Sequence, residues 1–149
     1  MSQRIDGPAV APDLYKALHA VERYLRQNVD EMLYHLVKLR ASILNECAFC
    51  VDMHSNDALE LGESPTRLFA VAAWRESPFF TDAERAALAL TDSVTRIGDA
   101  GVPDDVWAEA AEHFDEKALA DLVAAAAMIN LWNRVAIPFR ATPLSAVAA

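Results

Sequence analysis

Apolar residues recur every three or four positions along most of the chain, which is the spacing of one buried face of an α-helix. The first such segment opens at Pro12, and its apolar positions are Leu14, Leu18, Val21 and Leu25. No stretch alternates apolar and polar residues as a half-buried β-strand does. The pattern predicts an all-α fold, a helical bundle of about six to seven helices.

Capping residues and helix breakers divide this pattern into segments. Thr81 followed by Glu84 forms a capping box, and Asn45 and Asp115 are further N-cap candidates. After the helix that opens at Pro12, we expect helices over residues 30–44, 46–61, 65–77, 81–97, 103–114 and 119–137. For residues 30–61, one kinked helix is the alternative to two.

The segment 119–137 is apolar nearly all round, which is typical of a helix at the centre of a fold or at a contact between subunits. Within 30–44, Lys38 and Arg40 lie off the apolar stripe. Asp52, Asp57 and Glu60 are expected on the solvated face of the following helix, and Trp74, Trp107 and Trp132 in the core. We expect one domain over residues 1–149, with residues 1–11 and 141–149 flexible.

Composition and charge narrow the classes of function. Alanine, the best helix former, supplies 29 of the 149 residues. The net charge of −9 disfavours binding to nucleic acid or to an anionic membrane. The longest apolar run, residues 119–132, is shorter than the roughly 20 residues that cross a bilayer, and the first twelve residues do not have the pattern of a signal peptide. A cytoplasmic protein is therefore expected.

The chemistry-bearing residues are concentrated in a run of eight, which holds Cys47, Cys50 and His54. On a helix, Cys50 lies about 60° around the axis from Cys47, and His54 about 40° from Cys50, so all three share one face. The two cysteine Cα atoms are then about 5 to 6 Å apart, within the range that a disulfide spans. The pair is expected to cycle between dithiol and disulfide.

A position just past the Asn45 cap places both thiols near free backbone N–H groups, which favour a thiolate. His54, one turn after Cys50, can accept the thiol proton or return a proton to a leaving oxygen. This arrangement suggests Cys50 as the attacking thiol and Cys47 as its partner. The opposite assignment is open, because Cys47 lies nearer the start of the helix.

Two other roles for these residues are possible. Small buried cysteines often only fill a core. Alternatively, Cys47, Cys50 and His54 could bind zinc with His35 as a fourth ligand. His35 lies about 18 Å from Cys47 along an uninterrupted helix, so it could join them only through a sharp break or from another subunit.

The chain resembles the AhpD-like branch of the carboxymuconolactone decarboxylase superfamily, the alkylhydroperoxidase-type proteins. The residues that carry the resemblance are the Cys-x-x-Cys-x-x-x-His motif of Cys47, Cys50 and His54, and the stretches 36–42, 45–54, 73–88 and 129–134. The resemblance implies an oligomeric all-α fold, a homotrimer or homohexamer, and thiol peroxidase activity on a small-molecule hydroperoxide. It also implies Cys50 as the peroxidatic thiol, Cys47 as its disulfide partner and His54 in the proton relay.

The resemblance further implies a thiol or lipoyl reductant protein as partner and no cofactor or metal. The chain departs from the family pattern at His35, which stands where a relay glutamate is usual, and at Glu46, where glycine is common. His35 is therefore the candidate for the relay position. The competing functions are a decarboxylase-branch enzyme acting on a lactone acid, and a non-enzymatic helical oligomer that senses redox state or metal.

Overall fold

The computed structural model describes residues 2–99 and 101–147, and within these ranges the chain contains helices and no strands. The all-α prediction is confirmed. Seven helices have six or more residues: α2 (Pro12–Asn28), α3 (Glu31–Leu44), α4 (Ala48–Glu60), α5 (Pro65–Ala70), α6 (Asp82–Thr95), α7 (Asp104–His113) and α8 (Glu116–Phe139). Two one-turn helices, α1 (Gly7–Val10) and α9 (Leu144–Val147), and a 3₁₀ turn, η1 (Val71–Ala73), complete the described chain.

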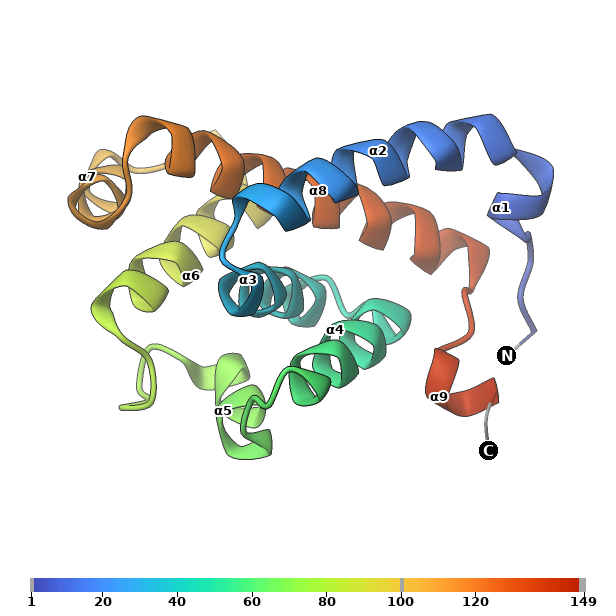
Figure 1. Ribbon diagram of the computed structural model, residues 1–149, viewed down its shortest axis with the longest axis horizontal. Helices are drawn as coiled ribbons and strands as arrows, with labels where there is room; N and C mark the ends of the chain where they lie inside the picture. Colours follow the sequence, from blue (N-terminus) through green and yellow to red (C-terminus); the bar gives the residue numbers. More distant parts are fainter. Residues whose placement is uncertain (1, 100, 148–149) are drawn as a thin grey trace.

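Helix α3 lies at the centre of the molecule and packs against α4, α6 and α8 (Figure 1). Its residues from Tyr34 to Ser42 are all buried. These include Lys38 and Arg40, so a stripe of apolar residues did not mark the whole buried surface of this helix. Buried charges need partners, and these two have them: Lys38 pairs with Glu22 of α2, and Arg40 with Asp92 of α6.

The chain breaks sharply between α3 and α4, which excludes a single kinked helix. Asn45 ends α3 as its C-cap, and Cys47 is the N-cap of α4, so the prediction that Asn45 caps the second of these helices is wrong. Between them, Glu46 adopts a left-handed backbone with φ of 57°. Left-handed φ is the conformation that glycine tolerates best. The Cys47 N–H donates to the Ser42 carbonyl at 3.0 Å, which closes the turn.

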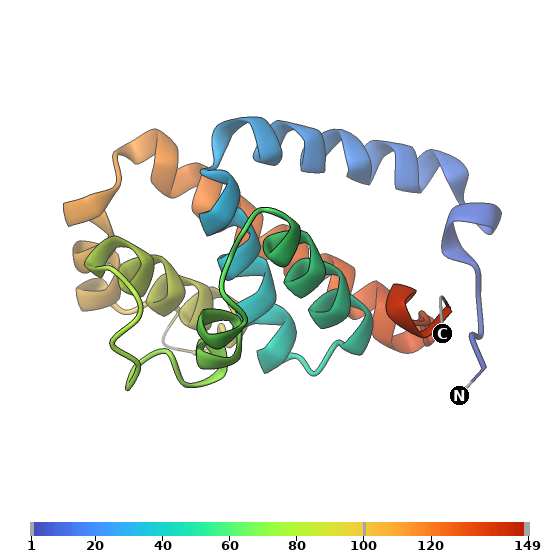
Figure 2. The same ribbon diagram turned by 60° about the horizontal axis from the view of Figure 1, so that its bottom comes forward.

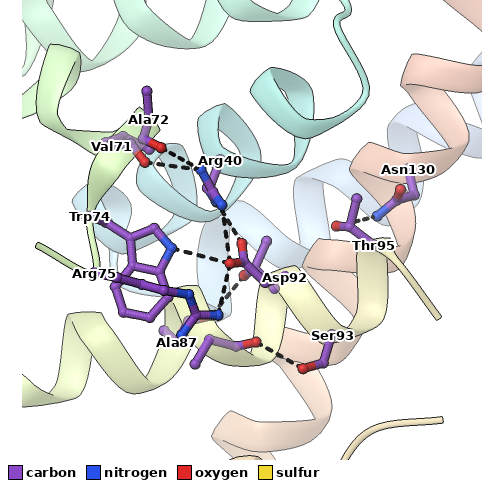
Figure 3. A network of polar contacts seen from close by, with 12 residues as sticks. Arg40, Val71, Ala72, Trp74, Arg75, Ala87, Asp92, Ser93, Thr95 and Asn130 are labelled. Atoms are coloured by element: carbon purple, nitrogen blue, oxygen red, sulfur yellow. Dashed lines mark hydrogen bonds and ion pairs between the residues drawn. The ribbon is translucent and has the colours of Figure 1, made fainter. Parts of the chain in front are cut away.

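The helix expected over residues 65–77 is shorter in the structure. Helix α5 ends at Ala70, and the 3₁₀ turn η1 follows it. Guanidinium groups bind the carbonyls that a continuing helix would have used. Arg40 donates to the carbonyls of Val71 and Ala72, and Arg85 to those of Trp74, Arg75 and Ser77. Figure 3 shows the first of these groups and the Arg40–Asp92 pair beside it.

The predicted caps of α6 and α8 are present. Thr81 and Glu84 form the reciprocal capping box, and the Asp115 carboxylate accepts from the Ala118 N–H at 2.8 Å. Trp74 is buried, but Trp107 is 45% exposed, contrary to the prediction. Its helix, α7, contributes only Ala110 to the fully buried core.

Helix α8 and the residues after it, Glu116–Ala146, are long and apolar enough to cross a membrane by length and composition alone. In the fold, however, α8 packs against α2, α3, α4, α6 and α7. Its buried residues Leu122, Ala126 and Ile129 are part of the hydrophobic core. This is the place of a core helix, one of the two settings that the sequence indicated.

Both chain ends approach the same end of the molecule, beside the C-terminus of α8 (Figures 1 and 2). The backbone N–H of Arg4 donates to the Phe139 carbonyl at 2.8 Å. On the other side, the Ser145 N–H donates to the Asp52 carboxylate on α4 at 3.0 Å. The terminal segments expected to be flexible thus contain a one-turn helix each, while residues 1 and 148–149 lie outside the described residues.

Candidate active site

The two cysteines lie at the start of α4, with Cys47 at the N-cap and Cys50 in the first turn. Both are free thiols and each is 1% exposed. Their sulfur atoms are 2.8 Å apart, so the two side chains share one hydrogen bond. This contact is the local consequence of the Cys-x-x-Cys spacing at a helix N-terminus.

The sulfurs differ in their hold on a proton. The pKa of Cys47 is lowered to about 7, because its sulfur shares a hydrogen bond with Cys50 and is also stabilised by the backbone N–H groups of Cys50 and Phe49 and by Asn133. The pKa of Cys50 is raised by the same shared hydrogen bond and by burial. These directions favour the thiolate form at Cys47 over that at Cys50.

His35 lies beside His54, although they belong to different helices. The break between α3 and α4 folds the two helices against each other and places the two Nδ1 atoms 3.3 Å apart. Both rings are 2% exposed. Burial lowers the pKa of both imidazoles, that of His54 well below the ordinary value, so both are neutral near pH 7. A neutral imidazole can accept a proton.

Asp57 extends this histidine pair toward solvent. Its carboxylate is 4.0 Å from His35 Nδ1, and its side chain is 33% exposed. The sequence prediction left Asp57 on the solvated face of α4. Its spacing of three residues from His54 would have placed both on one face, but the contact with His35 depends on the turn between the helices.

Sequence reasoning missed a buried group of four polar side chains, which we call the Glu22 cluster: Glu22 of α2, Tyr34 and Lys38 of α3, and Trp132 of α8. The Glu22 carboxylate accepts from Lys38 Nζ at 2.6 Å, from the Tyr34 hydroxyl at 2.5 Å and from Trp132 Nε1 at 2.6 Å. Glu22 and Lys38 are 9% and 1% exposed. No periodicity signals such a cluster, because its members come from three helices.

Burial perturbs the titration of the Glu22 cluster. Burial alone would raise the pKa of Glu22, but the Lys38 ammonium and the three donated hydrogen bonds hold it below its ordinary value. Burial lowers the pKa of Lys38 to about 8, even though Glu22 opposes that shift. The pKa of Tyr34 is raised by burial and by its bond to Glu22.

A cavity of about 490 Å³ connects these groups. Its polar lining includes Cys50, His54, Lys38 and Glu22. The remaining lining is largely aromatic and aliphatic, with Phe49, Met53, Tyr15, Trp132, Phe139 and Leu144 among its members. Both cysteines pack with Ala41 and Ile129 in the core, but of the two only Cys50 lines the cavity.

A polar network on the other side of Cys47 fixes the turn. Asn45 donates to the side-chain oxygens of Asn130 and Asn133 at 2.9 and 2.8 Å. Asn133 in turn donates to the Ser42 hydroxyl at 3.1 Å, and Asn130 donates to Thr95 at 3.0 Å, a contact drawn in Figure 3. These bonds tie α8 to the end of α3, which explains why Asn45 does not cap α4.

The ligand atoms of His35, His54 and Asp57 lie within 4.8 Å of one another, a grouping that could hold a metal ion. Within the described part of the chain, neither thiol belongs to this grouping. The zinc site considered from the sequence, with both thiols and both histidines as ligands, is therefore not assembled there.

Comparisons with known proteins identify the family of the chain. The model of the carboxymuconolactone decarboxylase family matches residues 11–93, more than half of the chain. The uncharacterized protein YdfG of Bacillus subtilis is 39% identical over 138 residues, which is 92% of this chain and 94% of that protein.

Solved structures agree. The chain superposes with a TM-score of 0.92 and 39% identity on a protein of unknown function from Agrobacterium tumefaciens, for which a role as the antioxidant defence protein AhpD is suggested; the match covers 95% of this chain and 98% of that one. An alkylhydroperoxidase AhpD core protein from Ralstonia eutropha, described as peroxidase-related, has a TM-score of 0.81 at 22% identity. That match covers 91% of this chain and 73% of the other, and it bears on the fold alone.

Proposed function

Because the chain belongs to the carboxymuconolactone decarboxylase family and is AhpD-like in fold, we propose that it is a thiol-dependent peroxidase that reduces organic hydroperoxides. The observation that carries the proposal is the contact between two buried thiols, one of which lines a largely apolar cavity. Such a cavity suits the apolar body of an organic hydroperoxide. Cys50 is the attacking thiol in this proposal, because it faces the cavity.

The reaction has two steps. His54 first accepts the one proton that the thiol pair loses when it ionises. The Cys50 thiolate then attacks the distal oxygen of the hydroperoxide, an S–O bond forms, the O–O bond breaks, and the alkoxide leaves with the proton from His54. The product is an alcohol, and Cys50 is oxidised to a sulfenic acid. The Cys47 sulfur then attacks that of Cys50, the S–O bond breaks, and water leaves with the Cys47 proton. A disulfide remains.

His54 and His35 move protons in this proposal. His54 is one helical turn from Cys50 on the same lining of the cavity, and its neutral ring accepts a proton. His35 and Asp57 form a path from His54 to the surface, with His35 in the relay position. The cycle closes when a thiol or lipoyl reductant protein in the cytoplasm reduces the disulfide. We also propose that the chain assembles as a homotrimer or homohexamer.

The test is hydroperoxide consumption by the reduced protein with dihydrolipoamide as reductant and cumene hydroperoxide as substrate. Wild type should turn over. Cys50→Ser should lose consumption. Cys47→Ser, reduced and freed of dihydrolipoamide, should consume one equivalent and stop, because its sulfenic acid then has no partner thiol. Full consumption by Cys50→Ser would overturn the proposal.

A further inference from the structure

The thiol and histidine steps leave the Glu22 cluster unexplained. Two opposite charges are buried there with complete hydrogen-bonding, and an apolar pair of similar size is often as stable as a buried ion pair. Tyr34 and Trp132 also pack in the core, but the two charged members, Glu22 and Lys38, line the same cavity as Cys50. This shared lining suggests a chemical role for the two charges.

Lys38 is the member of the cluster that acts on the thiol pair. Its charge lowers the pKa of Cys50, and the Cys50 charge in turn raises the pKa of Lys38. Two charged residues of α2 also act on Lys38: Glu22 raises the pKa of Lys38, and Arg26 lowers it. Lys38, Cys50 and His54 all line the same cavity.

The position of Lys38 in the cavity lining bears on which of the two sulfurs carries the negative charge. The lowered pKa of Cys47 favours the negative charge there, but only Cys50 of the two thiols lines the cavity. Attack on a molecule in the cavity requires the charge on Cys50. The two sulfurs are 2.8 Å apart, so transfer of the shared proton from Cys50 to Cys47 is enough to move it.

We propose that Lys38 is the cation that draws the negative charge of the pair onto Cys50, and that Glu22, Tyr34 and Trp132 hold its ammonium group in place. In this transfer the Cys50 S–H bond breaks, a Cys47 S–H bond forms, and no electrons are exchanged. The inference rests on the proposed function for its consequence, the choice of attacking thiol. Lys38 is a positioning residue: it acts through the location of the charge on the thiol pair and does not itself react.

The experiment measures the thiolate pKa of Cys50 alone, from the pH dependence of its alkylation by iodoacetamide in a Cys47→Ser chain. A second chain adds Glu22→Gln and Lys38→Met, which removes both charges of the pair and leaves neither one unpaired in the interior. Loss of the Lys38 charge, which lowers the Cys50 pKa, should raise that pKa by about one unit. Arg26→Met is the matched control, since Arg26 is a cation on the same cavity lining, and it should shift this pKa far less.

An unchanged Cys50 titration in the folded double variant would overturn the inference. Circular dichroism verifies that the double variant folds. If it does not, a second double variant, Glu22→Gln with Lys38→Gln, removes both charges and keeps groups that can form hydrogen bonds. Lys38→Arg keeps the positive charge and should leave the Cys50 pKa unchanged, so a raised Cys50 pKa in a folded Lys38→Arg chain also counts against the role of charge. The assay contains no peroxide. A shifted pKa in a chain that consumes no hydroperoxide would overturn the proposed function only, and consumption without a shift would overturn this inference only.

Discussion

The buried pair of Arg40 and Asp92 gives the sharpest stability prediction. Arg40 Nε and Nη2 donate to the two carboxylate oxygens at 2.6 and 3.1 Å, and both side chains are about nine-tenths buried. Asp92 also accepts from Trp74 Nε1 at 3.3 Å and from Arg75 at 3.1 Å (Figure 3). The pair thus joins α3, α6 and the segment after η1.

Asp92→Ala removes the only carboxylate from this network and leaves the Arg40 guanidinium buried with the carbonyls of Val71 and Ala72 as its partners. Breaking one side of a buried ion pair costs about 3–5 kcal/mol. For a chain of this size, each kcal/mol corresponds to about 2–4 °C in melting temperature, so we expect a loss of about 6–20 °C. Replacing both residues, as Arg40→Met with Asp92→Leu, should cost less than the single change, because no charge is left unpaired.

The assay is urea unfolding at pH 7 followed by circular dichroism, for wild type, the single variant and the double variant. Equal slopes with a lower midpoint would assign the change to stability and not to the denatured state. A loss below about 1 kcal/mol for Asp92→Ala would refute the reasoning, because a solvated pair costs that little. A double variant less stable than the single one would refute it as well.

Further predictions concern the turn and the histidines. Glu46→Gly should raise the free energy of unfolding by about 0.5–1 kcal/mol in the same assay, since glycine relieves the left-handed strain at φ of 57°; a loss of stability would contradict this. His54→Gln should slow sulfenic acid formation by about 10²-fold or more in stopped-flow traces, whereas His113→Gln on the exposed surface of α7 should not. Both His35 and His54 have lowered pKa values, so the unfolded chain binds more protons than the folded one below about pH 6.5. The free energy of unfolding should therefore fall as the pH falls from about 6.5 toward the lowered pKa values. Chemical unfolding of wild type and His35→Gln across this pH range measures the effect. A free energy of unfolding that does not change with pH in wild type would contradict the burial argument.

Much of the fold was visible in the sequence because it is locally encoded. The capping box at Thr81 and the cap at Asp115 depend on residues three positions apart, and both are present. The contact between Cys47 and Cys50 likewise follows from local helical spacing. By contrast, Asn45 has the residue type of an N-cap, but long-range bonds to Asn130 and Asn133 claim its side chain.

The rest of the candidate site depends on tertiary structure. His35 reaches His54 because the turn at Glu46 folds α4 back on α3, which no helix period specifies. Glu22 was indistinguishable from the solvated residues of α2, whereas its partner Lys38 lies 16 positions further along. Helix α2 illustrates the limit: two residues of its predicted apolar stripe, Leu14 and Val21, are more than 40% exposed, while Glu22 is buried.

The central claim is that the two thiols react as a pair with a hydroperoxide. The most direct test is a count of free thiols in reduced, metal-free wild-type protein before and after one equivalent of cumene hydroperoxide, with mass spectrometry to locate any disulfide. The account predicts that both thiols disappear together and that Cys47 and Cys50 become joined in a disulfide. Two thiols that stay titratable after the addition would contradict it.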